Sequence, residues 1–200
     1  PDPIGGGGSG QMGQADASGN DLAFEVSLTS PDDASFLNFQ ETVQADEADR
    51  DYEDFVENES FKNTVTIEYN GETATCTGAG NGIDVEINGA DVVVSSVKKA
   101  EYVLTGKTGN GSFRINSNEN KDDNKKSKVV LKGVSLRSAS QAAINIQNGK
   151  RCYLVLEGDS YVEGSCTDSG TGSMKAAIFS EGKLLVSGIG HLTVSENNRH

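Results

Sequence analysis

Basic side chains recur in the second half of the chain, beside short apolar strands. Because neighbouring residues of a strand point to opposite faces, a cation that alternates with apolar residues lies on the face away from them. Arginine pairs with carboxylates through two parallel hydrogen bonds, so several cations on one face would suit the evenly spaced carboxylates of an acidic polymer. The candidate binding residues are Arg114, Lys128, Lys132, Arg137, Lys150, Arg151 and Tyr161.

The same pattern has a plainer interpretation. Charged side chains on the outside of a sheet protect its exposed edges and need no ligand. Aromatic residues add limited support, because the chain has no Trp, seven Phe and five Tyr. Tyr102, Tyr153 and Tyr161 are candidates to stack on sugar rings, whereas Phe113 and Phe179 are expected in the core. Ligand binding and simple surface charge both remain open at this point.

Catalytic chemistry has little support in the sequence. The two histidines, His191 and His200, have no zinc-type spacing, and no nucleophile elbow is present. A lyase would need a base beside carboxylates, and residues 118–128 hold both types, with Asp122 and Asp123 among lysines. A solvated loop of mixed charge is the commoner meaning of such a run. We therefore expect a protein that is not an enzyme.

Acidic residues are concentrated near the N-terminus. The net charge is −13, and residues 1–72 hold 17 acidic residues against two basic ones. This excess argues against general nucleic-acid binding, which depends on neutralising phosphates. Residues 31–60 are expected to stay solvated, as blocks of like charge usually do. The alternative is an ordered calcium site, for which Asp159, Asp168 and the acidic run 46–59 are candidates, with no one set singled out.

Most of the chain after residue 62 shows the two-residue alternation of half-buried strands. In residues 64–69, Val65, Ile67 and Tyr69 occupy one side and polar residues the other. No segment shows a helical stripe with a period of 3.6 residues. The expected strands are 64–69, 73–78, 82–96, 100–106, 111–117, 128–138, 142–147, 152–158, 176–180, 183–188 and 191–195, with 21–30 as a further short candidate.

The strands form a repeat. An "AAI" triplet follows a strand–glycine–strand unit at residues 142–144 and again at 176–178. Repeats of about 20–30 residues made of short strands indicate a solenoid, whose turns must stack to bury their apolar face. We therefore predict an all-β fold, a single-stranded parallel β-helix, with an antiparallel sandwich as the alternative. Residues 116–127 and 165–175 are expected to be polar loops.

The domain organisation follows from composition. Residues 1–50 are expected to form a flexible acidic and Gly-rich tether, and residues 51–200 the β-helix domain. The coil is expected to continue past His200, because no turn or cap follows the last strand. No apolar run approaches the roughly 18 residues of a membrane helix. The three cysteines are expected to be buried thiols, and a Cys152–Cys166 bridge stays open.

Several linked phrases between residues 51 and 200 resemble one family. They include "DYEDFVENESFKNTVTIEYNGETATCTG", "GIDVEINGADVVVSS", "VVLKGVSLRS", "AAINIQNGKRCYLVLEG" and "FSEGKLLVSGIGHLTVSENNRH". They are similar to the carbohydrate-binding β-helix proteins found on the surfaces of gut Bacteroidales and of cellulolytic clostridia. The resemblance implies a right-handed parallel β-helix, binding of cellulose or of acidic sugars such as polygalacturonate, and bound calcium. It also implies a secreted lipoprotein whose lipid-attachment cysteine was removed upstream of residue 1.

These observations together predict a non-catalytic, cell-surface polysaccharide-binding module for acidic or plant cell-wall glycans. Its expected location is extracellular or on the outer cell surface, either secreted or lipid-anchored, without a transmembrane segment and without a nucleic-acid partner. Two alternatives remain open. The chain is a structural adhesin or stalk whose coil is only a spacer, or, with less support, a calcium-dependent polysaccharide lyase.

Overall fold

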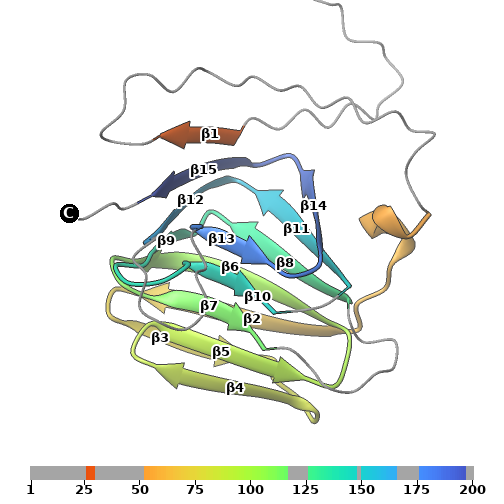
Figure 1. Cartoon of the computed structure of the whole chain (residues 1–200). Coiled ribbons are helices and arrows are strands. Elements are labelled where there is room, and N and C mark those ends of the chain that lie inside the picture. Colours follow the sequence, from red (N-terminus) through yellow and green to blue (C-terminus); the bar gives the residue numbers. More distant parts are fainter. Residues whose placement is uncertain (1–25, 30–51, 117–125, 148–149, 166–175, 197–200) are drawn as a thin grey trace, which may run out of the picture.

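The computed structural model describes residues 52–116, 126–147, 150–165 and 176–196, together with the backbone of a short strand at residues 26–29. The described chain is all-β apart from two single 3₁₀ turns. Its strands form a strongly curled, largely parallel sheet and a second, smaller sheet (Figure 1).

The first sheet has five strands that lie side by side and run parallel. In spatial order they are β2 (Asn63–Asn70), β6 (Ala100–Thr108), β8 (Lys126–Lys132), β11 (Arg151–Glu157) and β14 (Lys183–Gly188). The second half of β6 also pairs with β9, so the sheet branches there. The branch continues in parallel through β9 (Ser135–Arg137), β12 (Asp159–Gly164), β15 (His191–Glu196) and β1 (Val26–Thr29).

The chain repeats a passage of three strands, and the last strand of each passage lies in the second sheet. β5 (Asp91–Ser96), β7 (Ser112–Ile115), β10 (Ile144–Ile146) and β13 (Ile178–Ser180) are parallel neighbours. The chain therefore runs β8–β9–β10 and then β11–β12–β13, and each strand of the second passage pairs with its counterpart in the first. An antiparallel sandwich does not have this pairing.

Two hairpins stand at the start of the stack. β3 (Thr73–Thr77) pairs antiparallel with β2, and β4 (Ile83–Asn88) pairs antiparallel with β5. The prediction of one strand over 82–96 was therefore wrong, because the chain reverses at Gly89. That glycine has φ +61°, a left-handed conformation that glycine adopts without strain.

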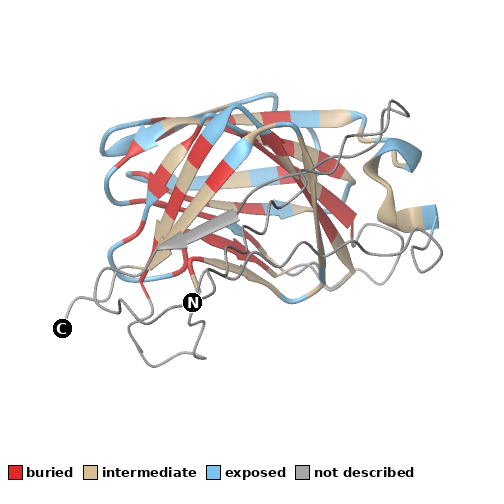
Figure 2. Cartoon of the chain, turned by 90° about the horizontal axis from the view of Figure 1, so that it is seen from above, coloured by how far each residue is buried: buried red, intermediate tan, exposed pale blue. Residues whose placement is uncertain are grey.

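Buried apolar residues form one continuous core. Buried positions recur along neighbouring strands, as the red bands in Figure 2 show. In one column Leu104, Leu131 and Leu156 are paired in register and fully buried. The predicted recurrence of "AAI" is confirmed, because Ile144 and Ile178 are partners in β10 and β13. Small residues are needed beside them: a Cβ on Gly164 would lie 2.4 Å from the Cα of Ala177.

The structure corrects the exposure expected for three residues. Val130 alternates with apolar Val129 and Leu131, which predicts that it lies on the polar side of its strand with Lys128 and Lys132, yet it is buried. Tyr102 was a candidate for sugar stacking, but its ring is in the core, 5.6 Å from the ring centroid of Phe113. Tyr153 is buried as well, although it lies outside the core cluster. The tether prediction falls mostly outside the described residues, and within it the strand Val26–Thr29 pairs with β15.

Candidate functional site

One basic residue stands at, or directly before, the start of each of the five parallel strands β2, β6, β8, β11 and β14. Lys126, Arg151 and Lys183 are partners at one position in β8, β11 and β14. The pairing of Glu101 with Lys128 puts Lys99 level with Lys126, and the pairing of Asn63 with Ala100 puts Lys62 level with Lys99. We call these five residues the basic ladder: Lys62, Lys99, Lys126, Arg151 and Lys183.

The ladder follows from the pleat of the strands. Cys152, Leu154 and Leu156 point into the core, so Arg151 and Tyr153 point out of the sheet. Neighbouring strands are about 4.8 Å apart, so the outward cations form a row with that step. Like charges at this distance repel one another, and the row therefore needs anions.

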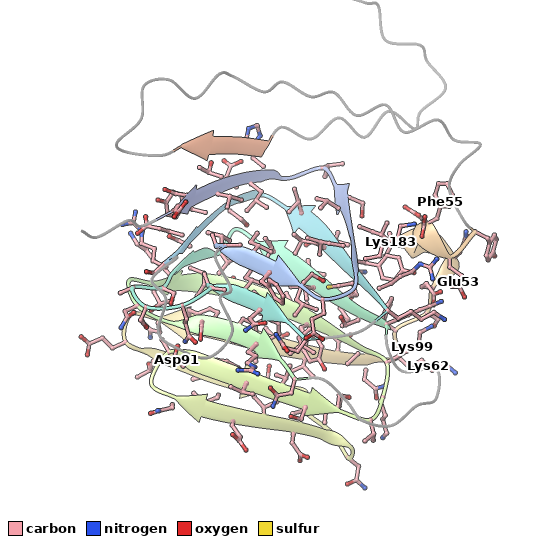
Figure 3. The ribbon with its side chains drawn as sticks, viewed as in Figure 1. Glu53, Phe55, Lys62, Asp91, Lys99 and Lys183 are labelled. Atoms are coloured by element: carbon pink, nitrogen blue, oxygen red, sulfur yellow. The ribbon has the colours of Figure 1, made fainter. Side chains whose placement is uncertain are left out.

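The chain supplies those anions itself. Residues 52–61, which we call the acidic segment, form two 3₁₀ turns (Tyr52–Asp54 and Val56–Asn58) and lie beside the ladder. Figure 3 shows Glu53 on the same side of the molecule as Lys183, Lys99 and Lys62, with Asp91 on the opposite side.

Each carboxylate of the acidic segment that faces the ladder bridges two of its cations. Glu59 contacts Lys99 and Lys126. Glu53 lies 3.0 Å from Lys126 Nζ and 2.6 Å from Arg151 Nη1. Asp54 accepts a hydrogen bond from Arg151 Nε at 3.0 Å and also contacts Lys183. Anions and cations therefore alternate across four strands.

The ion pairs shift the pKa of their members. The hydrogen bond from Lys126 lowers the pKa of Glu53 below its ordinary value. Burial raises the pKa of Asp54, but the hydrogen bonds from Lys183 and Arg151 more than offset it and the net shift is downward. Burial likewise opposes the downward shift in the pKa of Glu59, where Lys126 and Lys99 prevail. The carboxylates are therefore ionised at neutral pH, as the pairing requires.

The acidic segment also covers an aromatic ring. Tyr153 lies on the outer face of β11, yet it is only 1% exposed. Its hydroxyl donates to the backbone carbonyl of Glu53, and the Phe61 ring meets it edge-on with centroids 6.0 Å apart. Lys99 Nζ lies 5.5 Å from the centroid of the Phe61 ring. Tyr153 thus lies outside the core cluster, and the acidic segment contributes to its burial.

The structure brings together two of the seven candidate residues at this place. Arg151 belongs to the ladder, and Lys150 Nζ lies 3.8 Å from Glu53. Lys128 is on the same face one step further along its strand, where it pairs with Glu101 at 2.6 Å. Lys132 is exposed at the far end of β8, and Arg114 is exposed on β7 in the second sheet. These cations do not share one face.

Arg137 and Tyr161 form a separate cluster on the branch of the first sheet. The Arg137 guanidinium lies 4.8 Å from the centroid of the Tyr161 ring. The Tyr161 hydroxyl donates to Glu163 Oε2 at 2.5 Å. Burial raises the pKa of Tyr161, and this hydrogen bond to a carboxylate raises it further. Because its hydroxyl and ring are both engaged, Tyr161 offers less to a sugar than its exposure suggests.

Sequence reasoning missed four members of the ladder: Lys62, Lys99, Lys126 and Lys183. A signal was present, because a lysine or arginine comes within three residues before the apolar part of each of these strands. The expectation that the acidic run 31–60 stays solvated was wrong for Glu53, Asp54 and Glu59, which pair with the ladder. The run has a matching row of cations on the sheet, and the register that forms this row is not visible in the sequence.

Metal binding finds no support in the described residues, where no group of three or more suitable side chains is close enough to hold an ion. Glu53, Asp54 and Glu59 do not fit a calcium site, because each is already paired with lysine or arginine. Asp159 is exposed, and Asp168 lies outside the described residues. No helix in the described ranges is long and apolar enough to span a membrane.

Comparison with known proteins identifies the class. A family model described as "Carbohydrate-binding domain-containing protein" matches residues 88–200, which is more than half of the chain. The chain therefore belongs to this carbohydrate-binding family. The matched residues include four of the five ladder cations, whereas the acidic segment precedes them. No curated protein and no solved structure matches the chain.

Proposed function

We propose that this protein is a non-catalytic module that binds acidic polysaccharides along the basic ladder. Membership of a carbohydrate-binding family supports a sugar polymer as the ligand. The row of cations in the basic ladder supports a ligand that carries negative charge. The observation that carries the proposal is the register of Lys126, Arg151 and Lys183, which repeats a cation at every strand. A linear polymer of uronic acids repeats a carboxylate in the same way, and such a row pairs with it at several points at once.

The proposed fold explains why the ladder is regular. We propose that the stacked passages are coils of a right-handed parallel β-helix, each coil adding one cation to the row. The passages β8–β9–β10 and β11–β12–β13, which pair strand by strand, support this architecture. A solenoid presents an extended surface, and such surfaces suit long ligands.

The cellular setting is part of the proposal. Plant cell-wall or other acidic glycans are extracellular, so the module belongs outside the cell, secreted or attached through a lipid upstream of residue 1. Calcium remains a prediction, with no ligand set among the described residues to carry it. The adhesin or stalk alternative predicts no glycan binding, and the lyase alternative predicts cleavage of the polymer.

Binding to a matched pair of polymers tests the function. Biolayer interferometry would compare immobilised polygalacturonate with the same polymer fully methyl-esterified, with calcium and with a chelator. We expect binding to the acid form that weakens with salt and with Lys62→Gln plus Lys183→Gln. Lys98→Gln plus Lys107→Gln, which removes two exposed lysines outside the ladder, is the matched control. Equal binding to both polymers, or none to either, would contradict the proposal.

A further inference from the structure

We infer that the acidic segment is a displaceable stand-in for the ligand, which covers the binding site until a polymer of uronic acids replaces it. This inference rests on the proposed function and adds two things to it. It assigns Tyr153, now covered, as the surface on which a sugar ring stacks. It also assigns Glu53, Asp54 and Glu59 as the groups whose places the carboxylates of the polymer take.

The contacts of the acidic segment show what the ladder binds. Glu59 bridges the cations of β6 and β8, Glu53 those of β8 and β11, and Asp54 those of β11 and β14. One carboxylate therefore lies between the cations of each two neighbouring strands, from β6 to β14. The side-chain oxygens of these three residues occupy the positions that evenly spaced carboxylates of an acidic polymer would occupy.

The acidic segment is held in a way that allows it to leave. Its two 3₁₀ turns contain no buried residue, and no strand pairing joins it to the sheet. The ion pair at its outer end lies partly in water, since the Lys183 side chain is 49% exposed, whereas the side chains of the Lys126–Glu59 pair are 7% and 8% exposed. Exposed pairs of this kind contribute little to stability. The ladder strands, by contrast, are fixed by a continuous buried core.

Displacement is an exchange of like for like. Lys126 is only 7% exposed because the acidic segment covers it, and it would keep a carboxylate partner when a polymer took over. The freed Glu53, Asp54 and Glu59 would return to water, where ionised carboxylates are stable. Breaking a buried ion pair is usually costly because one charge stays buried without a partner. In this exchange no buried charge loses its partner, either before or after the polymer binds.

Tyr153 adds an aromatic surface to the cations of the uncovered site. Its ring lies on the outer face next to Arg151, and Lys128 is its partner on the neighbouring strand. The contacts of its ring and hydroxyl include two residues of the acidic segment, namely Phe61 and Glu53. Removing the acidic segment would expose an aromatic face beside cations, which suits a sugar ring that carries a carboxylate.

Opening the site by mutation tests the inference. The variant Glu53→Gln, Asp54→Asn, Glu59→Gln keeps the shapes of the three side chains and removes their charge. When only a fraction of the molecules has an uncovered site, the apparent affinity is reduced in proportion to that fraction. We therefore expect this variant to bind polygalacturonate at least about tenfold more tightly. The matched control, Glu57→Gln, Glu68→Gln, Glu72→Gln, removes three exposed acidic residues and should change the affinity much less.

The unmodified protein supplies a second readout that does not depend on any variant. The amides of Asn58 and Glu59 donate to Phe55 and Val56 within the acidic segment. Hydrogen exchange at these two amides should become faster when polygalacturonate is added, because the ligand displaces the segment. Slower exchange would mean that the polymer binds over the segment, and would overturn the inference.

The outcomes separate this inference from the proposed function. Binding through the ladder with equal affinity in the opened variant and the control would overturn the stand-in role and leave the proposed function intact. No binding by the unmodified protein or by the opened variant would overturn both. Tighter binding by the opened variant alone, with faster exchange in the unmodified protein, supports both.

Discussion

The Glu59 carboxylate contacts the Lys126 ammonium, and both side chains are more than nine-tenths buried although neither lies in the apolar core. Burial lowers the pKa of Lys126, but the hydrogen bonds that it donates to Glu59 and Glu53 prevail and raise it. The pair is buried because one segment of the chain lies on top of a sheet that is already complete. The stability of the Glu59–Lys126 ion pair therefore reports how stably the acidic segment is docked on the sheet.

Removing the charge of Lys126 should have a limited effect on stability. Breaking an ion pair inside a protein core costs about 3–5 kcal/mol. We expect Lys126→Met to lower the free energy of unfolding by only about 1 kcal/mol, because the acidic segment can undock and return Glu59 to water. Urea denaturation would measure the change against Lys107→Met, an exposed control. A loss of about 3 kcal/mol or more would show that the acidic segment is an integral part of the fold.

Docking of the acidic segment should depend on pH in a defined direction. The folded-state pKa values of Glu53, Asp54 and Glu59 lie below the ordinary values of 4.5 for Glu and 3.8 for Asp. Their contribution is therefore complete above pH 4.5 and is lost as the pH falls through the lower folded values. Hydrogen-exchange protection of the Glu59 amide, corrected for the intrinsic rate, should be constant from pH 7 to 4.5 and fall below that. Protection that persists at pH 2 would contradict the electrostatic account.

The opened variant allows the stacking role of Tyr153 to be tested. In that background we expect Tyr153→Leu to weaken polygalacturonate binding by roughly three- to tenfold. An aromatic contact contributes about 0.5–1.5 kcal/mol in addition to the burial of its apolar surface area. Tyr161→Leu is the comparison, because Tyr161 was also predicted to stack and lies outside the ladder. If Tyr161→Leu had the larger effect, the binding face would lie on β12 and β9 instead.

A backbone prediction tests the packing of the parallel strands β2 and β6. Gly106 has φ +84°, and a Cβ there would lie 2.1 Å from the carbonyl oxygen of Tyr69 on the neighbouring strand β2. Gly106→Ala should therefore destabilise the fold by at least about 2 kcal/mol, through both the clash and the left-handed backbone. Gly80→Ala is the control, because nothing lies within 4 Å of its Cβ position. Equal midpoints of thermal unfolding for the two variants would be inconsistent with this packing.

The sequence was informative where a residue pattern maps directly onto local structure. Alternation in residues 64–69 predicted β2, and the "AAI" triplets predicted that Ile144 and Ile178 stack. The hairpin at Gly89 was missed because both of its strands carry the same alternation, so the stretch resembles one long strand.

The binding surface was harder to predict, because it depends on register between distant strands. Lys99, Lys126 and Lys183 join one row only when the parallel strands pair, and the numbers of residues between them differ, so no fixed spacing marks them. The docking of Glu53 and Glu59 needs the same information. A run of acidic residues is usually solvated, and only the facing row of cations makes this one an exception.

Cross-link mapping tests the central claim most directly, because it shows which amines touch the carboxylates of the ligand. A carbodiimide joins a carboxylate to a lysine only when the two are in contact, and mass spectrometry locates the bond. Without ligand we expect links from Glu59 to Lys99 and Lys126. With an oligogalacturonate present, these links should decrease and the sugar should be attached to Lys99, Lys126 and Lys183. Attachment only to Lys98, Lys107 or Lys132, with the Glu59 links unchanged, would contradict the account.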